Sequence, residues 1–224
     1  MEWDIVSREG RKSLSFNPKR LIIVGFAGRD VEKTLEHIRE LEAEGIKCPQ
    51  EVPVVYECSP ALLTRAASID VVAGASSGEV EYVVVKHAGK TYVGLGSDHT
   101  DRALEAVSIH KSKQLCAKPV AREVWDYDEI VDHFASVRLF SRQALNGEEI
   151  DYQAGSTADL LPLETILAKV QREVPDLEDC VVYTGTVPLK QGFKFGERFS
   201  CSLVDDLLGR RIDLAYEIRT IEEH

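Results

Sequence analysis

The sequence predicts an α+β protein built on a mixed or mainly antiparallel β-sheet. Three observations support this fold class. Segments rich in β-forming residues follow one another in pairs joined by short turns, amphipathic helical patterns are few, and strands do not alternate regularly with helices. Regular alternation would favour a doubly wound parallel sheet, whereas grouped strands favour an α+β fold. Because no GxGxxG motif lies between a predicted strand and a helix, the sequence argues against a Rossmann domain.

The composition indicates a folded, acidic protein. Of its 224 residues, 44% are hydrophobic and 29% are charged, so we expect a single domain over 1–224 with 1–20 as an N-terminal extension. The 27 basic and 38 acidic residues give a formal charge of −11, which repels nucleic acids and anionic membrane surfaces. A bound cation or a local Lys or Arg can reverse this field inside a pocket, so an anionic substrate stays compatible with the composition.

The cysteines and the first residues bear on the cellular compartment. The five cysteines are scattered singly, which fits neither a disulfide framework nor the paired spacing of zinc sites. Residues 1–13 are polar and charged, and nowhere do eighteen apolar residues follow one another. We therefore expect a cytoplasmic protein without a membrane-spanning segment.

In the first part of the chain, a buried strand and an amphipathic helix are predicted. The apolar run at 21–26 favours a strand. Asp30 can cap a helix that begins at Val31 and is stopped by Gly45. Two further strands are expected at 53–57 and 69–74, with a turn between them at 59–64.

Hairpins dominate the rest of the predicted structure. Residues 79–98 are expected to form one that turns at Gly89, and Asn146-Gly147 is a strong two-residue turn signal for another. Pro162 suits the first turn of a helix whose apolar positions extend to Val174. The remaining predictions are a short helical pattern within 119–134, a strand at 180–187, and a final hairpin with arms at 199–204 and 210–221.

Three acidic residues on the 79–98 hairpin form a candidate metal site. Glu79 and Glu81 are two apart on a predicted strand, so their side chains project from one face and repel each other unless a cation intervenes. A turn at Gly89 would bring Asp98 back beside them. Oxygen ligands favour Mg²⁺, Mn²⁺ or Ca²⁺ over zinc. The alternative is that the two glutamates lie on a solvated face of the sheet.

Several motifs in the same order resemble those of the fumarylacetoacetate hydrolase superfamily. Residues 98–102, Asp-His-Thr-Asp-Arg, resemble its Asp-x-Ser/Thr-x-Arg signature, which follows a Glu-x-Glu metal pair. Lys118 falls where the family places its active-site lysine, and 183–188 resemble its Thr-Gly-Thr-Pro segment, whose second threonine contacts substrate. The segment VGFAGRD at 24–30, followed by HIREL at 37–41, resembles the opening of the family with its His-x-x-Glu lid pair.

The resemblance covers roughly 21–215 and indicates a subfamily of unknown function. It implies a rolled, mixed β-sheet with a few peripheral helices, a homodimer, and Mg²⁺, Mn²⁺ or Ca²⁺ held by Glu79, Glu81 and Asp98. The implied activity is hydrolysis of a carbon–carbon bond in an acylpyruvate-like or other 2-oxo acid, a small carboxylate-bearing substrate. A decarboxylase, dehydratase or isomerase with the same site, and a non-catalytic ligand-binding protein, are the alternatives. The chain departs from the family at Glu105, where relatives often have glutamine.

The resemblance also implies catalytic residues. Lys118 would stabilise developing negative charge, with Lys111 and Lys113 as nearby competitors and an ordinary surface lysine as the alternative. His37 and Glu40 lie three apart on a predicted helix, which permits a pair that activates water if this helix covers the pocket. The alternative for this pair is a solvated helix face.

Three more residues are expected to bind substrate. Gly185 and Thr186 could present a backbone N–H and a hydroxyl to a substrate carboxylate, or they could simply end a strand. Arg102 could bind that carboxylate with two hydrogen bonds, or it could pair with Asp98 or Asp101 and hold the metal site in shape.

Overall fold

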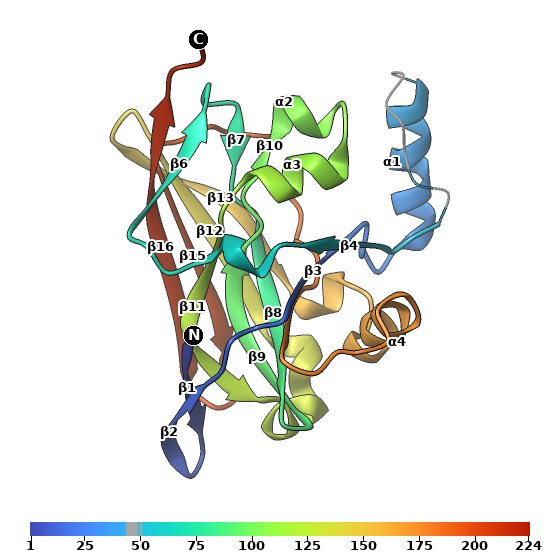
Figure 1. Cartoon of the computed structure of the whole chain (residues 1–224), viewed down its shortest axis with the longest axis vertical. Coiled ribbons are helices and arrows are strands. Elements are labelled where there is room, and N and C mark those ends of the chain that lie inside the picture. Colours follow the sequence, from blue (N-terminus) through green and yellow to red (C-terminus); the bar gives the residue numbers. More distant parts are fainter. Residues whose placement is uncertain (44–48, 50) are drawn as a thin grey trace.

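The structure, a computed structural model, describes residues 1–43, 49 and 51–224 (Figure 1). Most strands of the described residues belong to one nine-stranded sheet in the order β2-β1-β11-β9-β8-β14-β3-β4, with β5 also paired to β11. Its members are β1 (Glu2–Ser7), β2 (Gly10–Ser15), β3 (Arg20–Gly25), β4 (Val54–Cys58), β5 (Leu63–Thr64), β8 (Val80–His87), β9 (Lys90–Ser97), β11 (Lys118–Asp126) and β14 (Cys180–Tyr183). The pairs β1–β11, β5–β11 and β14–β3 are parallel and the others antiparallel, so the sheet is mixed.

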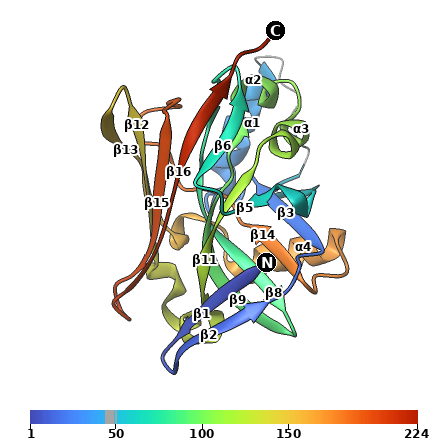
Figure 2. The same ribbon diagram turned by 60° about the vertical axis from the view of Figure 1, so that its left-hand side comes forward.

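A second sheet packs against the first. It has the order β13-β12-β15-β16-β6. Its strands are β6 (Ser68–Val72), β12 (Arg138–Leu145), β13 (Glu148–Ser156), β15 (Arg198–Asp205) and β16 (Arg210–Ile221). Figure 2 shows β12, β13 and β15 on one side of the molecule and β8 and β9 on the other, while β11 and β16 are neighbours between them. The two sheets together form a roll.

The main hydrophobic core lies between the two sheets. Tyr82 and Leu95 of the large sheet share it with Leu139, Phe199 and Tyr216 of the second sheet, and all five are almost fully buried. A second core covers the opposite face of the large sheet. Because β8 is buried on both faces, its sequence reads as an almost continuous apolar run.

Helices lie at the edges of this roll. They are α1 (Val31–Ala43), α2 (Arg102–Glu105), α3 (Ile109–Leu115) and α4 (Leu163–Glu173), with 3₁₀ turns η1 (Pro60–Leu62), η2 (Tyr127–Glu129), η3 (Val131–Ser136) and η4 (Thr157–Asp159). In Figure 1, α2 and α3 lie together above the large sheet, beside the two short strands β7 (Ser76–Ser77) and β10 (Thr100–Asp101). Within the described part of the chain, no helix has the length and apolar character needed to cross a membrane.

The predicted fold class and both predicted hairpin turns are confirmed. Strands β8 and β9 pair from Val80–Ser97 to His87–Lys90, leaving Ala88 and Gly89 as a two-residue turn. Both turn residues have positive φ, 51° and 72°. Asn146 and Gly147, with φ of 54° and 81°, join β12 to β13 in the same way. Positive φ at both central residues is what a type I′ hairpin turn requires.

Two parts of the chain differ from the sequence prediction. Within 119–134, where a short helical pattern was expected, residues 119–126 belong instead to the central strand β11, which buries Val120 and Val124 on one face and Trp125 on the other. Residues 1–20, for which no element was predicted, contain the hairpin β1–β2, and β1 pairs parallel to β11. The helix that starts at Val31 is confirmed, while its predicted end at Gly45 lies outside the described residues.

Candidate metal and substrate site

The β8–β9 hairpin brings the three predicted carboxylates together. Glu79 and Glu81 flank Val80 at the start of β8, and Asp98 follows the last residue of β9. The ladder continues past the strand ends, because the backbone N–H of Asp98 donates to the carbonyl of Glu79 at 3.0 Å. One oxygen of each carboxylate lies within 4.8 Å of the others. Glu81 is only 2% exposed and Asp98 is fully buried, so these acids do not form a solvated face.

Two lysines hold the Asp98 carboxylate. The Nζ atom of Lys113 lies 2.5 Å from Oδ2, and that of Lys118 lies 3.1 Å from Oδ1. Burial alone would raise the pKa of Asp98, but the two ammonium groups outweigh it and hold this pKa well below its ordinary value. Asp98 is therefore a stable anion. Lys118 also donates to the carbonyl of His99 at 2.6 Å, which ties the end of β9 to the start of β11.

The pKa values of Glu79 and Glu81 are raised, whereas that of Asp98 is lowered. Burial raises the pKa of Glu81 well above its ordinary value, and the nearby Asp98 carboxylate raises it further. Burial also raises the pKa of Glu79, although the Arg102 guanidinium opposes this. A divalent cation would relieve both effects, and a carboxylate oxygen has more than one lone pair, so the lysine-bound oxygens of Asp98 can still accept it. The donor set therefore fits a hard cation.

Arg102 fixes the position of Glu79. Its guanidinium lies 3.3 Å from Oε1 of Glu79 and 2.7 Å from Oε2 of Glu105. The expected partners were Asp98 or Asp101, and the second of these instead caps α2 by accepting the backbone N–H of Leu104 at 2.8 Å. Asp98 and Asp101 are close to Arg102 in the sequence. In the structure, the turn into α2 directs the Arg102 side chain towards Glu79 at the start of β8.

The segment after β14 fixes Glu81 and the start of β8. The backbone N–H of Gly185 donates to Oε2 of Glu81 at 2.8 Å. Gly185 has φ of +102°, and an added Cβ would lie 2.9 Å from the Cβ of Ala27, so only glycine fits without strain. The hydroxyl of Thr186 donates to the carbonyl of Val80 and accepts from Gln153, at 2.8 and 2.7 Å. Gly185 and Thr186, two of the three residues predicted to bind substrate, thus lie at the site. The hydroxyl of Thr186 is hydrogen-bonded to protein atoms.

A cavity of about 1040 Å³ opens beside these groups. Glu79, Glu81, Arg102, Lys113 and Thr186 belong to its wall. The rest of the wall includes apolar residues from the loops after β3 and β14 and from α3: Phe26, Ala27, Ile109, Val187, Pro188, Leu189 and Phe193. The cavity therefore combines a charged end around Glu79 and Glu81 with a larger apolar part, as small-molecule sites commonly do. Further charged residues of the wall are Arg29, Asp30, Lys33, Glu105 and Asp159.

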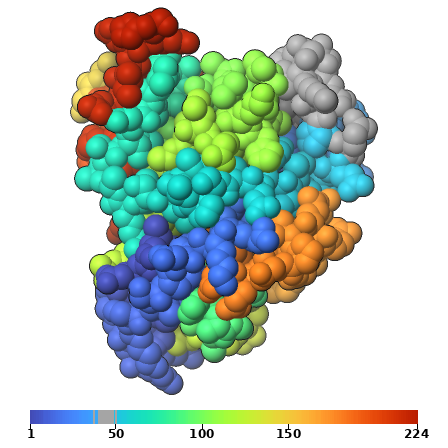
Figure 3. All heavy atoms as spheres, viewed as in Figure 1, coloured from blue at the N-terminus to red at the C-terminus, as the bar shows by residue number. Residues whose placement is uncertain are grey.

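Lys113, which the sequence offers only as a competitor of Lys118, lies at the site. It lines the cavity, whereas Lys118 is fully buried and does not belong to the described wall. The catalytic role of Lys118 stays a prediction. In Figure 3 the green segment that contains α2 and α3 forms a continuous part of the surface. The Lys113 side chain points inward from this segment and is only 5% exposed. Recognising Lys113 from the sequence would have required predicting α3.

The predicted pair His37 and Glu40 belongs to α1, but both side chains lie outside the described residues. The backbone just before this helix, including Gly28 and Asp30, contributes to the cavity wall. The role of the pair as a general base therefore stays a prediction.

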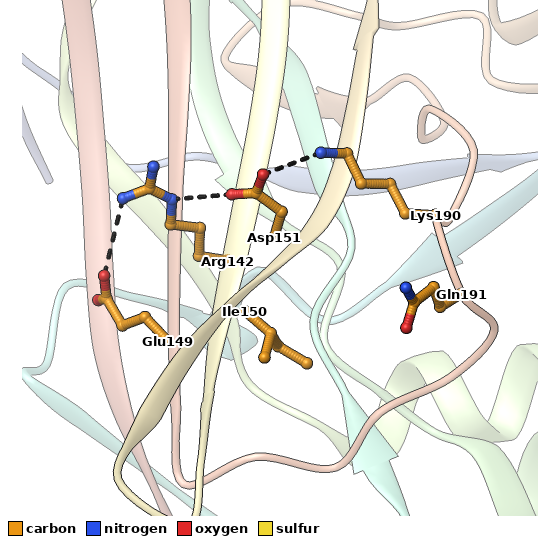
Figure 4. A pocket seen from close by; sticks show the side chains of 6 residues that line it. All are labelled: Arg142, Glu149, Ile150, Asp151, Lys190 and Gln191. Carbon is orange, nitrogen blue, oxygen red and sulfur yellow. Dashed lines mark hydrogen bonds and ion pairs between the residues drawn. The ribbon is translucent and has the colours of Figure 1, made fainter.

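A second hollow, of about 680 Å³, lies on the outer surface of β12 and β13 (Figure 4). Its charged side chains neutralise one another. Arg142 pairs with Asp151 at 3.2 Å and with Glu149 at 3.7 Å, and Lys190 pairs with Asp151 at 3.0 Å. Exposed ion pairs of this kind leave no charge free for a ligand, so this hollow is not a candidate site.

Two solved structures share this fold, and one of them is described as a fumarylacetoacetate hydrolase family protein. A 2-keto-3-deoxy-D-arabinonate dehydratase complexed with magnesium and 2,5-dioxopentanoate matches with a TM-score of 0.66 and 16% identity, covering 93% of this chain and 75% of that one. Yeast ynq8, a fumarylacetoacetate hydrolase family protein, matches with a TM-score of 0.61 and 16% identity, covering 92% and 96%. These likenesses confirm the rolled fold that the sequence motifs implied.

Comparisons of sequence give the family. A search of curated proteins found no match. The family model described as "Protein of unknown function (DUF2848)" matches residues 24–216, which include the β8–β9 hairpin, the described cavity wall and most strands of the two sheets. The chain therefore belongs to this family of proteins of unknown function, and it has the fold of the fumarylacetoacetate hydrolase superfamily.

Proposed function

We propose that this protein is a metal-dependent enzyme that acts on a 2-oxo acid. The observation that carries the proposal is the convergence of Glu79, Glu81 and Asp98, whose ligand oxygens lie within 4.8 Å of one another at the charged end of the cavity. Three carboxylates suit Mg²⁺, Mn²⁺ or Ca²⁺, of which Mg²⁺ is our first choice. When bound, such a cation would polarise the 2-oxo group and favour its enolate.

The charge of the cluster supports an anionic substrate. Its members are four carboxylates, Glu79, Glu81, Asp98 and Glu105, and three cations, Arg102, Lys113 and Lys118. Fully ionised, they leave one negative charge in excess, which agrees with the raised pKa values of Glu79 and Glu81. With a divalent cation the excess becomes one positive charge. That charge would complement the single carboxylate of a 2-oxo acid.

The first reaction to test is hydrolysis of a carbon–carbon bond in an acylpyruvate-like substrate. Water adds to the distal acyl carbonyl, the bond from that carbon to the methylene breaks, and its electron pair passes to the 2-oxo group as an enolate. A proton then returns to carbon, giving a 2-oxo acid and a second carboxylic acid. The positive charge of Lys118 would stabilise the enolate, and His37 with Glu40 would activate the water.

A second candidate is a lyase or isomerase reaction at the same site. It is favoured by the dehydratase whose structure, complexed with magnesium and 2,5-dioxopentanoate, shares this fold. Dehydration, decarboxylation and isomerisation can all start from the same enolate chemistry. In both candidates a homodimer remains our expectation for the assembly.

A panel of 2-oxo acids, analysed by the mass of the products, tests the proposal. Hydrolysis yields two fragments whose masses sum to substrate plus water, dehydration loses one water, and isomerisation conserves mass. Turnover should require Mg²⁺, stop with a chelator, and be lost in the double variant Glu79→Gln/Glu81→Gln. The control is Glu178→Gln/Asp179→Asn, which changes an acidic pair beside the turn of the β8–β9 hairpin. This variant should keep activity.

Two outcomes would contradict the enzyme proposal. Turnover that persists in Glu79→Gln/Glu81→Gln would remove the metal-site assignment. Tight binding of 2-oxo acids with no product from any of them would indicate a non-catalytic binding protein that has retained the fold.

A further inference from the structure

We infer that Lys113 binds the substrate carboxylate, and that Arg102, for which the sequence predicted this role, serves to position Glu79. The inference rests on the proposed function and names the residue of this site that recognises the acid group. It follows from how many hydrogen-bond donors Arg102, Lys113 and Lys118, the three cations around the carboxylates, have left after their protein contacts. Arg29 and Lys33 also line the cavity, but both are exposed to solvent.

Lys113 has donors to spare. Its ammonium carries three N–H donors, and within the described residues its acceptor is a single atom, Oδ2 of Asp98 at 2.5 Å. The side chain is 5% exposed and belongs to the cavity wall. Two donors of a buried cation are thus available to a ligand in the cavity. A carboxylate is the ligand that best satisfies them, because charge-assisted hydrogen bonds are the strong ones.

Helix α3 determines this orientation. Ile109 and Lys113 are four residues apart, so they lie on one face of the helix, and both belong to the cavity wall. Lys111, two residues before Lys113, is exposed. Lys111 therefore provides a matched control on the same helix.

Lys118 is already committed to the protein. It donates to the carbonyl of His99 at 2.6 Å and lies 3.1 Å from Oδ1 of Asp98. It is fully buried and does not belong to the described cavity wall. Its charge can act on the site through Asp98, but its donors face protein atoms.

Arg102 is committed as well. Its Nε donates to the hydroxyl of Ser77 at 2.8 Å, and its two terminal nitrogens contact Glu79 and Glu105. One face of the guanidinium is covered by the ring of Phe193, with 4.4 Å between the guanidinium carbon and the ring centroid. Two carboxylates neutralise this charge, so a substrate would have to displace Glu105 to bind it. The contacts suit a residue that holds Glu79 in place.

Isothermal titration with oxalate at saturating Mg²⁺ tests the assignment, because oxalate is a planar dianion that resembles the enolate of a 2-oxo acid. Lys113→Met is expected to weaken oxalate binding at least about tenfold, the usual effect of losing a charged hydrogen bond. Lys113→Arg, which keeps the charge, should bind oxalate better than Lys113→Met. Lys111→Met should stay close to wild type, and Arg102→Lys, at saturating Mg²⁺, should weaken oxalate binding clearly less than Lys113→Met does.

The outcomes separate this inference from the proposed function. If wild-type protein binds neither Mg²⁺ nor oxalate, the proposed function fails. If wild type binds both and Lys113→Met binds oxalate within about twofold of wild type, only the Lys113 assignment is overturned. An equal loss in Arg102→Lys and Lys113→Met would also overturn it. Circular dichroism checks the fold, and if Lys113→Met is unfolded, Lys113→Gln and the comparison of Lys113→Arg with Arg102→Lys decide.

Discussion

Three groups that could bind a metal gather at each end of the β8–β9 hairpin, and the two sets differ sharply in environment. At one end are Glu79, Glu81 and Asp98, and at the other are His87, Glu178 and Asp179. In each set the ligand atoms lie within 4.8 Å of one another. At the second end, Asp179 is already paired with His87 at 2.5 Å and with Lys19 at 2.7 Å.

The comparison shows that proximity of ligand atoms does not by itself make a strong site. Asp179 and His87 keep 17% and 25% of their side-chain surface exposed. The hydrogen bond from Lys19 lowers the pKa of Asp179, so this carboxylate is a stable anion without a metal. Glu81 is buried and its pKa is raised, so a cation would relieve a cost at this end that the other end does not have.

The largest expected difference concerns the lysines that serve the two ends. Lys118→Met removes a fully buried cation from Asp98, and we expect a loss of about 3–5 kcal/mol in the free energy of unfolding. Lys19→Met removes a partner of Asp179 that is 61% exposed, and we expect a much smaller loss, because solvent screens this pair. Urea denaturation measures both. Similar losses would mean that the two ends do not differ in burial as described.

Two glycines give the next comparison. Gly185 and Gly89 both have positive φ, but a Cβ at Gly185 would meet Ala27 at 2.9 Å, whereas a Cβ at Gly89 meets nothing within 4 Å. Gly89→Ala should therefore cost about 1 kcal/mol, the backbone term alone. Gly185→Ala adds overpacking and should cost about 2–4 kcal/mol. Thermal unfolding of the two variants tests this order, and an equal cost would contradict the close approach at Gly185.

A smaller effect concerns pH in the metal-free protein. The folded-state pKa of Glu81 is raised above its ordinary value of 4.5. The proton that stabilises the folded state is therefore fully bound below pH 4.5 and is lost as the pH rises through the folded-state pKa. Glu81→Gln stays neutral throughout. With a chelator present, it should melt above wild type at pH 8, and the difference should shrink towards pH 4. A difference independent of pH would contradict the raised pKa.

Much of the fold could be predicted because local signals agreed with tertiary structure. The β-branched residues of the strands on both sides of Gly89, and the Asn146-Gly147 pair, specify their turns within a few residues. Strand β11 was missed because Pro119 opens it and Arg122-Glu123 break its apolar pattern. The charged pair is tolerated because Arg122 pairs with Glu2 and Asp4 of the neighbouring β1, and Glu123 pairs with Arg11 of β2.

The site was only partly predictable for a similar reason. Glu79, Glu81 and Asp98 lie on one hairpin, so local register is sufficient to place them together. The partners of Arg102, namely Glu79 and Glu105, depend on where α2 turns, which spacing does not specify. Lys113 depends in addition on α3, a short helix with no strong capping signal, since Ser108 makes no side-chain cap.

A Mg²⁺ titration followed by thermal unfolding tests directly whether the metal binds at Glu79, Glu81 and Asp98. At about 100 times the dissociation constant, Mg²⁺ should stabilise wild-type protein by about 2.7 kcal/mol. Glu79→Gln/Glu81→Gln should lose this stabilisation, and Glu178→Gln/Asp179→Asn should retain it. If Mg²⁺ still stabilises the first variant but not the second, the metal binds at the exposed end of the hairpin and the account is contradicted.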